Sequence, residues 1–236
     1  MLDLVHEDLT QLASRYRPEY IERIAQEFSK FGCAQIYDAA PEYCHVLPDY
    51  LLPRVSHLSI AGPAFPVATQ NDMLPLLQAL DLAPPGWVLF VRNDAQESEA
   101  LAGDIFVTAM RSQKLGGLVV DGAVRDMGTL PALQIPVFSR QVRFVSAKTA
   151  RIPAAVVPAS LDYGHYTVEP GDFVFGDSDG MLLVKKKYLT AVIHGARYLL
   201  QRESALKARL DEGFRLAELV GLTTFLAGEG KLKFDV

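Results

Sequence analysis

A helical segment lies between two segments that are apolar along their whole length. Residues 87–91 form a continuous apolar run, residues 102–117 carry apolar side chains at helical spacing, and residues 118–120 are apolar again. Strands without a polar face are typical of parallel sheets that are covered on both sides. A strand, a helix and a second buried strand in this order therefore predict an α/β fold.

Similar alternation extends on both sides of this unit. A helix should begin at Pro18 and end at Gly32, a second short helix should end at Pro41, and a strand over 57–69 should break at Gly62-Pro63. Further along, two β-rich runs flank the sequence Asp177-Ser178-Asp179-Gly180, which predicts a hairpin, and a long helix should follow from about Tyr188 to Leu210. Half of the 236 residues are apolar, enough for one sizeable core.

Charge and composition argue against several classes of protein. The formal net charge is -5 and no basic stripe is present, so we expect no nucleic-acid partner. No apolar run approaches the roughly 18 residues that span a bilayer, so we expect no membrane partner. Cys33 and Cys44 form no disulfide framework, and the first ten residues are acidic and lack the apolar core of a secretory leader. These features favour a cytoplasmic location.

Asp104 and the pair Arg125-Asp126 stand out as candidate site residues. Asp104 is placed as the N-cap of the helix over 104–115, and Arg125-Asp126 follows the next strand. A helix that leads back to a parallel strand starts near that strand's end, so the three side chains should converge at one edge of the sheet. Free amides in the first turn, from Ile105 and Phe106, favour an anion there.

The chemistry of these side chains suits a keto acid and a metal ion. A guanidinium binds a carboxylate or keto-acid oxygens in bidentate fashion, and carboxylates with waters suit Mg²⁺ or Mn²⁺. The alternative is structural: Asp104 caps a helix, and Arg125 and Asp126 form a surface ion pair worth less than about 1 kcal/mol. No dinucleotide-binding, phosphate-loop or nucleophile-elbow motif competes with this site.

Four segments between residues 33 and 184 resemble the RraA-like family, which includes the regulator of ribonuclease activity A and the class II 4-hydroxy-4-methyl-2-oxoglutarate/4-carboxy-4-hydroxy-2-oxoadipate aldolases. They are IAGPAFPV, GGLVVDGAVRD, IPVFSR and VEPGDFVFGDSDGMLLV, in family order. An acidic residue, twenty residues and then Arg-Asp mark the aldolase branch, and Asp104, Arg125 and Asp126 fit that pattern. The resemblance implies a single domain over 1–236 with a core of about 33–184, an N-terminal helix within 1–32 and a C-terminal helix and arm over 185–236.

The same resemblance implies a fold and roles for individual residues. The fold would be a β/β/α sandwich of the swivelling, phosphohistidine-domain-like type. Asp126 would bind the divalent metal, Arg125 would bind the pyruvyl oxygens, and backbone amides from Gly103 to Phe106 would hold the pyruvyl carboxylate. Asp104 would position a water for proton transfer. Glu203 is the candidate for an acidic residue that reaches a neighbouring subunit's site in a homotrimer or homohexamer.

The expected activity is a metal-dependent retro-aldol cleavage. A 4-hydroxy-2-keto diacid, such as 4-hydroxy-4-methyl-2-oxoglutarate, would yield pyruvate and a second keto acid, with oxaloacetate decarboxylation as a side activity. Two alternatives stay open. One is a non-catalytic regulator that binds a ribonuclease; the other is a lyase on the same scaffold with a different substrate, because residues 105–107 are bulkier than is usual in the family.

Overall fold

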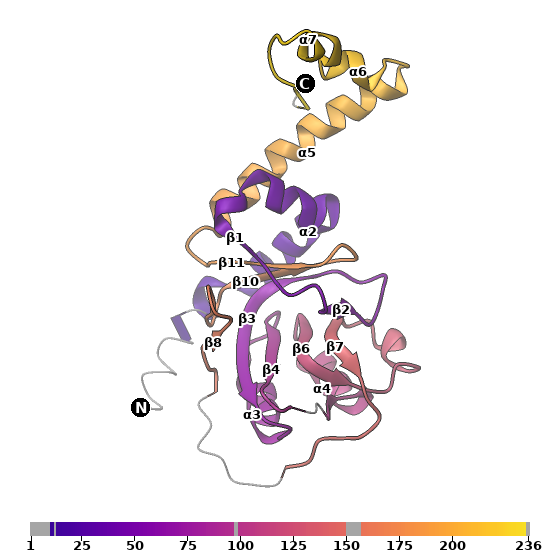
Figure 1. The fold of residues 1–236 in the computed structure, drawn as a ribbon. Coiled ribbons are helices and arrows are strands. Elements are labelled where there is room, and N and C mark those ends of the chain that lie inside the picture. The colour runs from indigo at the N-terminus through magenta and orange to yellow at the C-terminus, as the bar shows by residue number, and fades with distance from the viewer. Residues whose placement is uncertain (1–9, 12, 97–98, 150–156, 235–236) are drawn as a thin grey trace.

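The computed structural model describes residues 10–11, 13–96, 99–149 and 157–234 (Figure 1). Within these residues a nine-stranded mixed sheet has the order β1-β11-β10-β3-β4-β6-β7-β2, and β5 pairs with β6 off this path. The strands of this sheet are β1 (Cys44–Val46), β2 (Leu52–Pro53), β3 (Ile60–Thr69), β4 (Val88–Asn93), β5 (Ala100–Ala102), β6 (Gly117–Val124), β7 (Val137–Val142), β10 (Phe173–Gly176) and β11 (Met181–Val184). A separate pair consists of β8 (Leu161–Asp162) and β9 (Thr167–Val168). The mixed α/β class predicted from the sequence is confirmed.

Four central strands, β3, β4, β6 and β7, pair in parallel. The connections between them contain α3 (Leu74–Leu82), α4 (Asp104–Ser112) and the short 3-10 helix η2 (Leu130–Leu133). Every residue of β6 is buried, as expected of a strand covered on both faces. β6 is longer than the predicted strand and includes Asp121, which is buried inside the sheet.

β3 belongs to two parts of the sheet. Its first residues, Ile60 to Pro63, pair antiparallel with β10, and the residues from Ala64 to Thr69 pair in parallel with β4. The predicted break at Gly62-Pro63 is therefore wrong, because the strand continues through these residues. The chain changes its pairing partner directly after Pro63, which has no N–H group to donate to a ladder.

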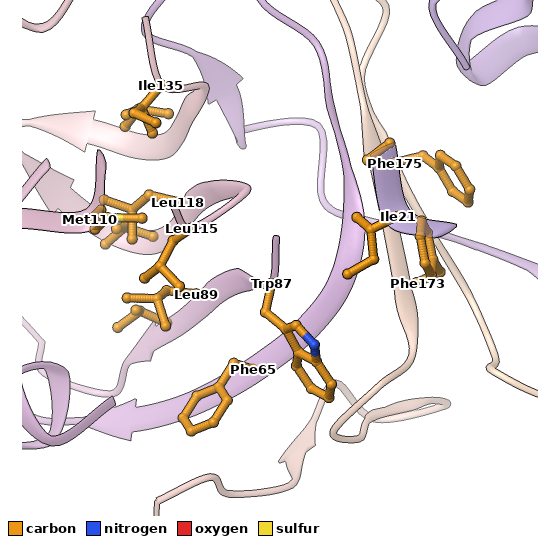
Figure 2. Close-up of a cluster of buried hydrophobic side chains, with 14 of the residues drawn as sticks. Ile21, Phe65, Trp87, Leu89, Met110, Leu115, Leu118, Ile135, Phe173 and Phe175 are labelled. Atoms are coloured by element: carbon orange, nitrogen blue, oxygen red, sulfur yellow. The ribbon is translucent and has the colours of Figure 1, made fainter. Parts of the chain in front are cut away.

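Two apolar cores lie on opposite faces of the strands. Phe173 and Phe175 of β10 contribute to the larger core, whereas Val174 between them contributes to the smaller one. Figure 2 shows part of the larger core, where Trp87 and Phe65 lie near Ile21 of the first long helix. The smaller core joins side chains of β10 and β11 to side chains of β4 and β6. Two β layers therefore enclose one core, and helices cover the other.

The long terminal helices pack on each other beside β10 and β11 (Figure 1). α2 (Pro18–Ala39) is interrupted at Gly32, whose φ of 81° is not helical, so two helical segments meet there as predicted. α5 (Leu189–Asp211) follows the predicted bounds closely, and its Arg197 lies 2.7 Å from Glu27 of α2. The chain ends in α6 (Leu216–Leu219) and α7 (Leu222–Leu226), and the 3-10 helix η1 (Pro41–Tyr43) follows α2. The predicted helix start at Pro18 is confirmed, and residues 1–9 of the expected N-terminal segment lie outside the described residues.

Both cysteines are free and buried, in agreement with the absence of a disulfide framework. Burial raises the pKa of Cys44 to about 11, and burial together with the Asp177 carboxylate raises that of Cys33. The predicted hairpin is formed by β10 and β11. Among the described residues, no helix combines the length and apolar character needed to cross a membrane.

Candidate functional site

The ends of β5 and β6 lie side by side. The two strands pair in parallel, with Ala102 opposite Val124, and the Arg125 N–H donates to the Ala102 carbonyl at 3.0 Å. Residues that follow the two strands, Gly103 and Asp104 on one side and Arg125 and Asp126 on the other, therefore emerge at the same edge. The predicted convergence of Asp104, Arg125 and Asp126 is confirmed, and Gly103 lies with them, although the three-residue strand β5 was too short to be predicted.

α4 begins at Asp104, and Gly103 occupies the N-cap position. The prediction of Asp104 as the N-cap is wrong, and the helix ends at Ser112, before the predicted glycine pair. The physical reason is that the extended backbone of Gly103 continues β5 to the first helical residue. Asp104 lies in the first turn of α4, where the helix dipole stabilises its negative charge.

Gly103, Asp104, Arg125 and Asp126 form one cluster. Within it, the Asp126 carboxylate makes two contacts. Its Oδ2 atom accepts the Asp104 N–H at 3.1 Å and lies 3.3 Å from Arg125 Nε. The Asp126 backbone has a φ of 63°, in the left-handed region, which turns the chain directly after β6. Oδ1 has no hydrogen-bond partner among the described residues, so one oxygen of the carboxylate can accept an external ligand.

Within the cluster, the Arg125 guanidinium group uses only its Nε atom. Its Nε faces Asp126, and the described residues supply no acceptor for its two Nη atoms. The side chain is 37% exposed and that of Asp126 is 32% exposed, so a ligand from solvent can reach both. This arrangement leaves the two-nitrogen fork available for a carboxylate or a pair of keto-acid oxygens.

Thr129 connects the two acidic residues. Its hydroxyl lies 3.3 Å from Asp104 Oδ2 and 3.1 Å from the Asp126 carbonyl, and its amide donates to the same carbonyl at 3.0 Å. The turn after β6 is therefore tied to the start of α4. Thr129 was not among the predicted site residues, because nothing in the sequence distinguishes a lone threonine in a turn from any other surface residue.

Gly103 is required by the close approach of Asp126. A Cβ atom at this position would lie 2.1 Å from Asp126 Oδ2 and 3.0 Å from Arg125 Cγ. The backbone at Gly103 is extended, so any residue could adopt its conformation. Space alone therefore demands glycine here.

The carboxylates of this cluster fit a magnesium-type ion better than a transition-metal site. Among the described residues, no group of three or more His, Cys, Asp or Glu side chains is arranged to hold a metal. Mg²⁺ keeps several waters and needs only one or two protein carboxylates. Asp126, with a free oxygen and partial exposure, and Asp104 beside it supply such a donor set.

An apolar cavity of about 220 Å³ adjoins the cluster. Gly103 and Arg125 belong to both the cluster and the cavity wall. The substrate-side residues predicted from the sequence differ in their positions: Phe106 is buried in the wall, whereas Ile105 is 80% exposed at the rim. The contribution of α3 to this wall was not predicted, because its apolar side chains have the spacing of an ordinary core helix.

Glu203 lies apart from this cluster in the same chain. It is on α5, which leaves the molecule on the side away from α4 (Figure 1). Its Oε2 atom accepts the Gln35 Nε2–H at 2.9 Å and lies 3.8 Å from Lys207 Nζ. Within one chain Glu203 therefore links α5 to α2.

Comparison with known proteins identifies a family and several relatives. The pattern of the RraA-like family, described as Aldolase/RraA, matches residues 33–183. A putative 4-hydroxy-4-methyl-2-oxoglutarate aldolase of Halalkalibacterium halodurans is 32% identical over 139 residues, which cover 58% of this chain and 65% of that protein.

Solved structures show the same fold. The RNA-processing inhibitor RraA from Thermus thermophilis is 25% identical with a TM-score of 0.58, and the match covers 64% of this chain and 90% of that one. An uncharacterized protein from Pseudomonas syringae pv. tomato is 24% identical with a TM-score of 0.72, over 84% of this chain and 92% of that one.

Proposed function

Because the chain belongs to the RraA-like family, we propose that it is a divalent-metal-dependent lyase that cleaves 4-hydroxy-2-keto acids to pyruvate and a second carbonyl compound. The observation that carries this proposal is the contact set of Asp126. One of its oxygens is held by Asp104 N–H and Arg125 while the other is free, in a cluster open to solvent. A purely structural surface pair has no need of this arrangement.

Each residue of the cluster has a role in binding the pyruvyl part. Asp126 and Asp104 would hold Mg²⁺ or Mn²⁺, which when bound polarises the C2 carbonyl. The free Nη atoms of Arg125 bind the keto-acid oxygens in bidentate geometry. Amides of Ile105 and Phe106 in the first turn of α4 have no acceptor inside the helix and can bind the carboxylate.

Cleavage moves one proton away from the substrate and one back to it. Asp104 positions a water that takes the proton of the C4 hydroxyl. As the C3–C4 bond breaks, its electron pair passes into the pyruvyl enolate, whose oxygen accepts hydrogen bonds from Arg125. C3 then takes up a proton to give pyruvate, and C4 leaves as a carbonyl group. The same enolate forms when oxaloacetate loses CO₂, so oxaloacetate decarboxylation is a proposed side activity.

The assembly is also a proposal: a homotrimer or homohexamer in which Glu203 contributes to a neighbouring site. The rival function is a regulator that binds a ribonuclease without catalysis; the Thermus thermophilis relative is described as an RNA-processing inhibitor. The free carboxylate oxygen and free guanidinium fork favour catalysis, since docking on a protein requires neither.

A pyruvate-release assay tests the proposal. We expect release from 4-hydroxy-4-methyl-2-oxoglutarate and from oxaloacetate with Mg²⁺ or Mn²⁺, and loss of both with EDTA. Asp126→Asn should reduce kcat by at least roughly 100-fold, because the isosteric amide cannot bind the cation as a carboxylate does. Asparagine tolerates the left-handed backbone, so folding should be retained.

A matched control separates charge loss from damage to the fold. Asp81→Asn removes a carboxylate from the exposed side of α3 and should leave the activity unchanged. A folded protein that binds Mn²⁺ and releases no pyruvate from either compound would require another substrate. A folded protein that binds no divalent metal and releases no pyruvate would favour the regulator.

A further inference from the structure

The cavity beside the cluster is lined almost entirely by hydrocarbon. Its lining side chains come from α3 and its N-cap, from β5 and from α4, and include Met73, Leu77, Leu80, Leu101, Ile105 and Phe106. The polar side chains among its lining residues are Arg125 and Ser146. Apolar cavities of roughly 150 Å³ accommodate a benzene-sized group, so about 220 Å³ has room for a hydrocarbon group of several carbon atoms.

The cavity directly adjoins the cluster, because the two share wall residues. Gly103 and Arg125 form part of its wall and also contact Asp126, so a ligand on the Arg125 fork has one end at the cavity mouth. Leu80, Leu101 and Phe106 are buried and form its interior, whereas Leu77 is 46% exposed at the mouth. A substrate whose keto-acid end binds the cluster can therefore extend the remainder into the cavity.

A second carboxylate would be poorly accommodated in this cavity. Arg125 is the one cationic side chain among the lining residues that the structure describes, and its Nε already faces Asp126. A carboxylate among leucine, methionine and phenylalanine side chains would lose its hydration without gaining a partner. An alkyl or aryl group in the same place gains from burial.

We propose that the cavity selects 4-hydroxy-2-keto monoacids with an apolar substituent at C4, in preference to the diacids. This rests on the proposed lyase function and narrows its substrate class: the products are pyruvate and an apolar aldehyde or ketone. In cleavage the C3–C4 bond breaks as before, the C4 hydroxyl gives up its proton, and C3 takes one up. The apolar group enters the cavity and takes no part in the chemistry.

The test compares substrates that differ only at C4. Pyruvate release is measured with Mg²⁺ from 4-hydroxy-2-oxohexanoate, which carries an ethyl group, and from 4-hydroxy-2-oxoglutarate, which carries a carboxylate. We expect kcat/KM for the ethyl compound to be higher by on the order of 10-fold or more. Along the series from pentanoate to heptanoate, each added methylene should raise kcat/KM about 4-fold.

A charge placed at the mouth should shift this preference toward the diacid. Leu77→Lys supplies a cation there, and its exposed position allows the ammonium to remain hydrated. We expect the ratio of kcat/KM values to shift toward the diacid by about 10-fold or more. Leu82→Lys on the same helix is the control, because Leu82 is 37% exposed and lies outside the cavity lining.

The outcomes separate the two proposals. A preference for the ethyl compound that Leu77→Lys shifts toward the diacid, and Leu82→Lys leaves unchanged, supports the inference. Preference of the unmodified protein for the diacid overturns the inference and leaves the lyase function intact. Cleavage of neither compound by folded, metal-loaded protein overturns the proposed substrate class, and the lyase function falls with it if the C3 protons of pyruvate also fail to exchange.

Discussion

At the scale of single residues, the left-handed backbone of Asp126 brings its side chain back toward α4. Asp and Asn adopt this conformation more readily than most residues, whereas a bulky or β-branched residue would be strained. Asp126 can therefore meet the Asp104 N–H and Arg125 in the two residues available after β6. Backbone strain of this kind is often found at functional sites.

Gly103→Ala tests how closely the cluster is packed. The new methyl group would lie 2.1 Å from Asp126 Oδ2, so the carboxylate must move by more than an ångström. We expect pyruvate release to fall on the order of 100-fold, because displacement of this size misplaces the binding groups. Stability should change little, since the backbone of Gly103 is already extended. Kinetic assays and thermal unfolding of the same preparation check both expectations.

Gly128→Ala is the matched control for this substitution. Gly128 lies in the turn after Asp126, and apart from its two chain neighbours no described residue has an atom within 4 Å of the place its Cβ would occupy. Its activity should equal that of the unmodified protein. Equal activity of Gly103→Ala as well would show that the Asp126 carboxylate does not need its observed position.

Residue-level features were only partly accessible from sequence. The order helix, strand, Arg-Asp predicts the meeting of Asp104, Arg125 and Asp126, because chain direction fixes which ends of a helix and a parallel strand adjoin. The roles of Gly103 and Thr129 were not predictable in the same way. They depend on distances of a few ångströms between segments separated by more than twenty residues, which no pattern records.

At the scale of elements, polar groups lie both inside β6, near its end, and directly after it. Arg125 and Asp126 follow it, while Asp121 lies inside it with a side chain only 3% exposed. Asp121 lies 2.7 Å from Arg140 of β7 and accepts the Tyr163 hydroxyl at 3.2 Å. Burial, followed by the charge of Asp121, raises the pKa of Tyr163, so the tyrosine remains a donor. Through its contacts with Arg140 and Tyr163, Asp121 connects β6 to β7 and to the segment before β9.

A double-mutant cycle measures this connection. Arg140→Ala leaves Asp121 buried without its cation and should reduce the free energy of unfolding by about 2–4 kcal/mol. Asp121→Ala should cost less, because Arg140 is 44% exposed and can be hydrated. The double variant should lose at least roughly 1 kcal/mol less than the sum of the single variants. Additive losses in urea unfolding would contradict the proposed coupling.

Helices and long strands were predictable and short elements were not. α5 and the interruption of α2 at Gly32 follow from apolar periodicity and from glycine, which act locally. β5 has three residues, and its strand character comes from pairing with β6. The continuity of β3 through Pro63 likewise depends on its two different partners.

At the scale of the whole molecule, the second half of α5 together with α6 and α7 forms an arm that extends away from the sheet and the helices packed on it (Figure 1). The buried residues of α5 all lie between Leu189 and Ala196, so the second half of the helix has little covering it. Large apolar side chains are exposed on this arm: Tyr198, Phe214, Leu216, Phe225, Leu226 and Phe234. An exposed apolar arm of this kind is typical of a subunit contact.

The proposed oligomer predicts the effect of charge on this arm. By light scattering, the full chain should have three or six times the chain mass. Leu226→Glu together with Phe225→Glu should lower that mass, because two charges would be buried without partners. Leu82→Glu on α3 should leave it unchanged. A monomeric full chain would contradict the proposed assembly and the role of Glu203 at a neighbouring site.

The most direct test of the central claim is the exchange of pyruvate C3 protons for deuterium, followed by NMR. Exchange requires only the pyruvyl end of the site, so it does not depend on the natural substrate. We predict exchange by the Mn²⁺- or Mg²⁺-loaded protein, loss of exchange with EDTA, and a fall of at least roughly 100-fold in Asp126→Asn. Exchange that persists in EDTA and in Asp126→Asn would contradict a metal-dependent site at Asp126. No exchange by folded, metal-loaded protein would contradict pyruvate enolate chemistry altogether.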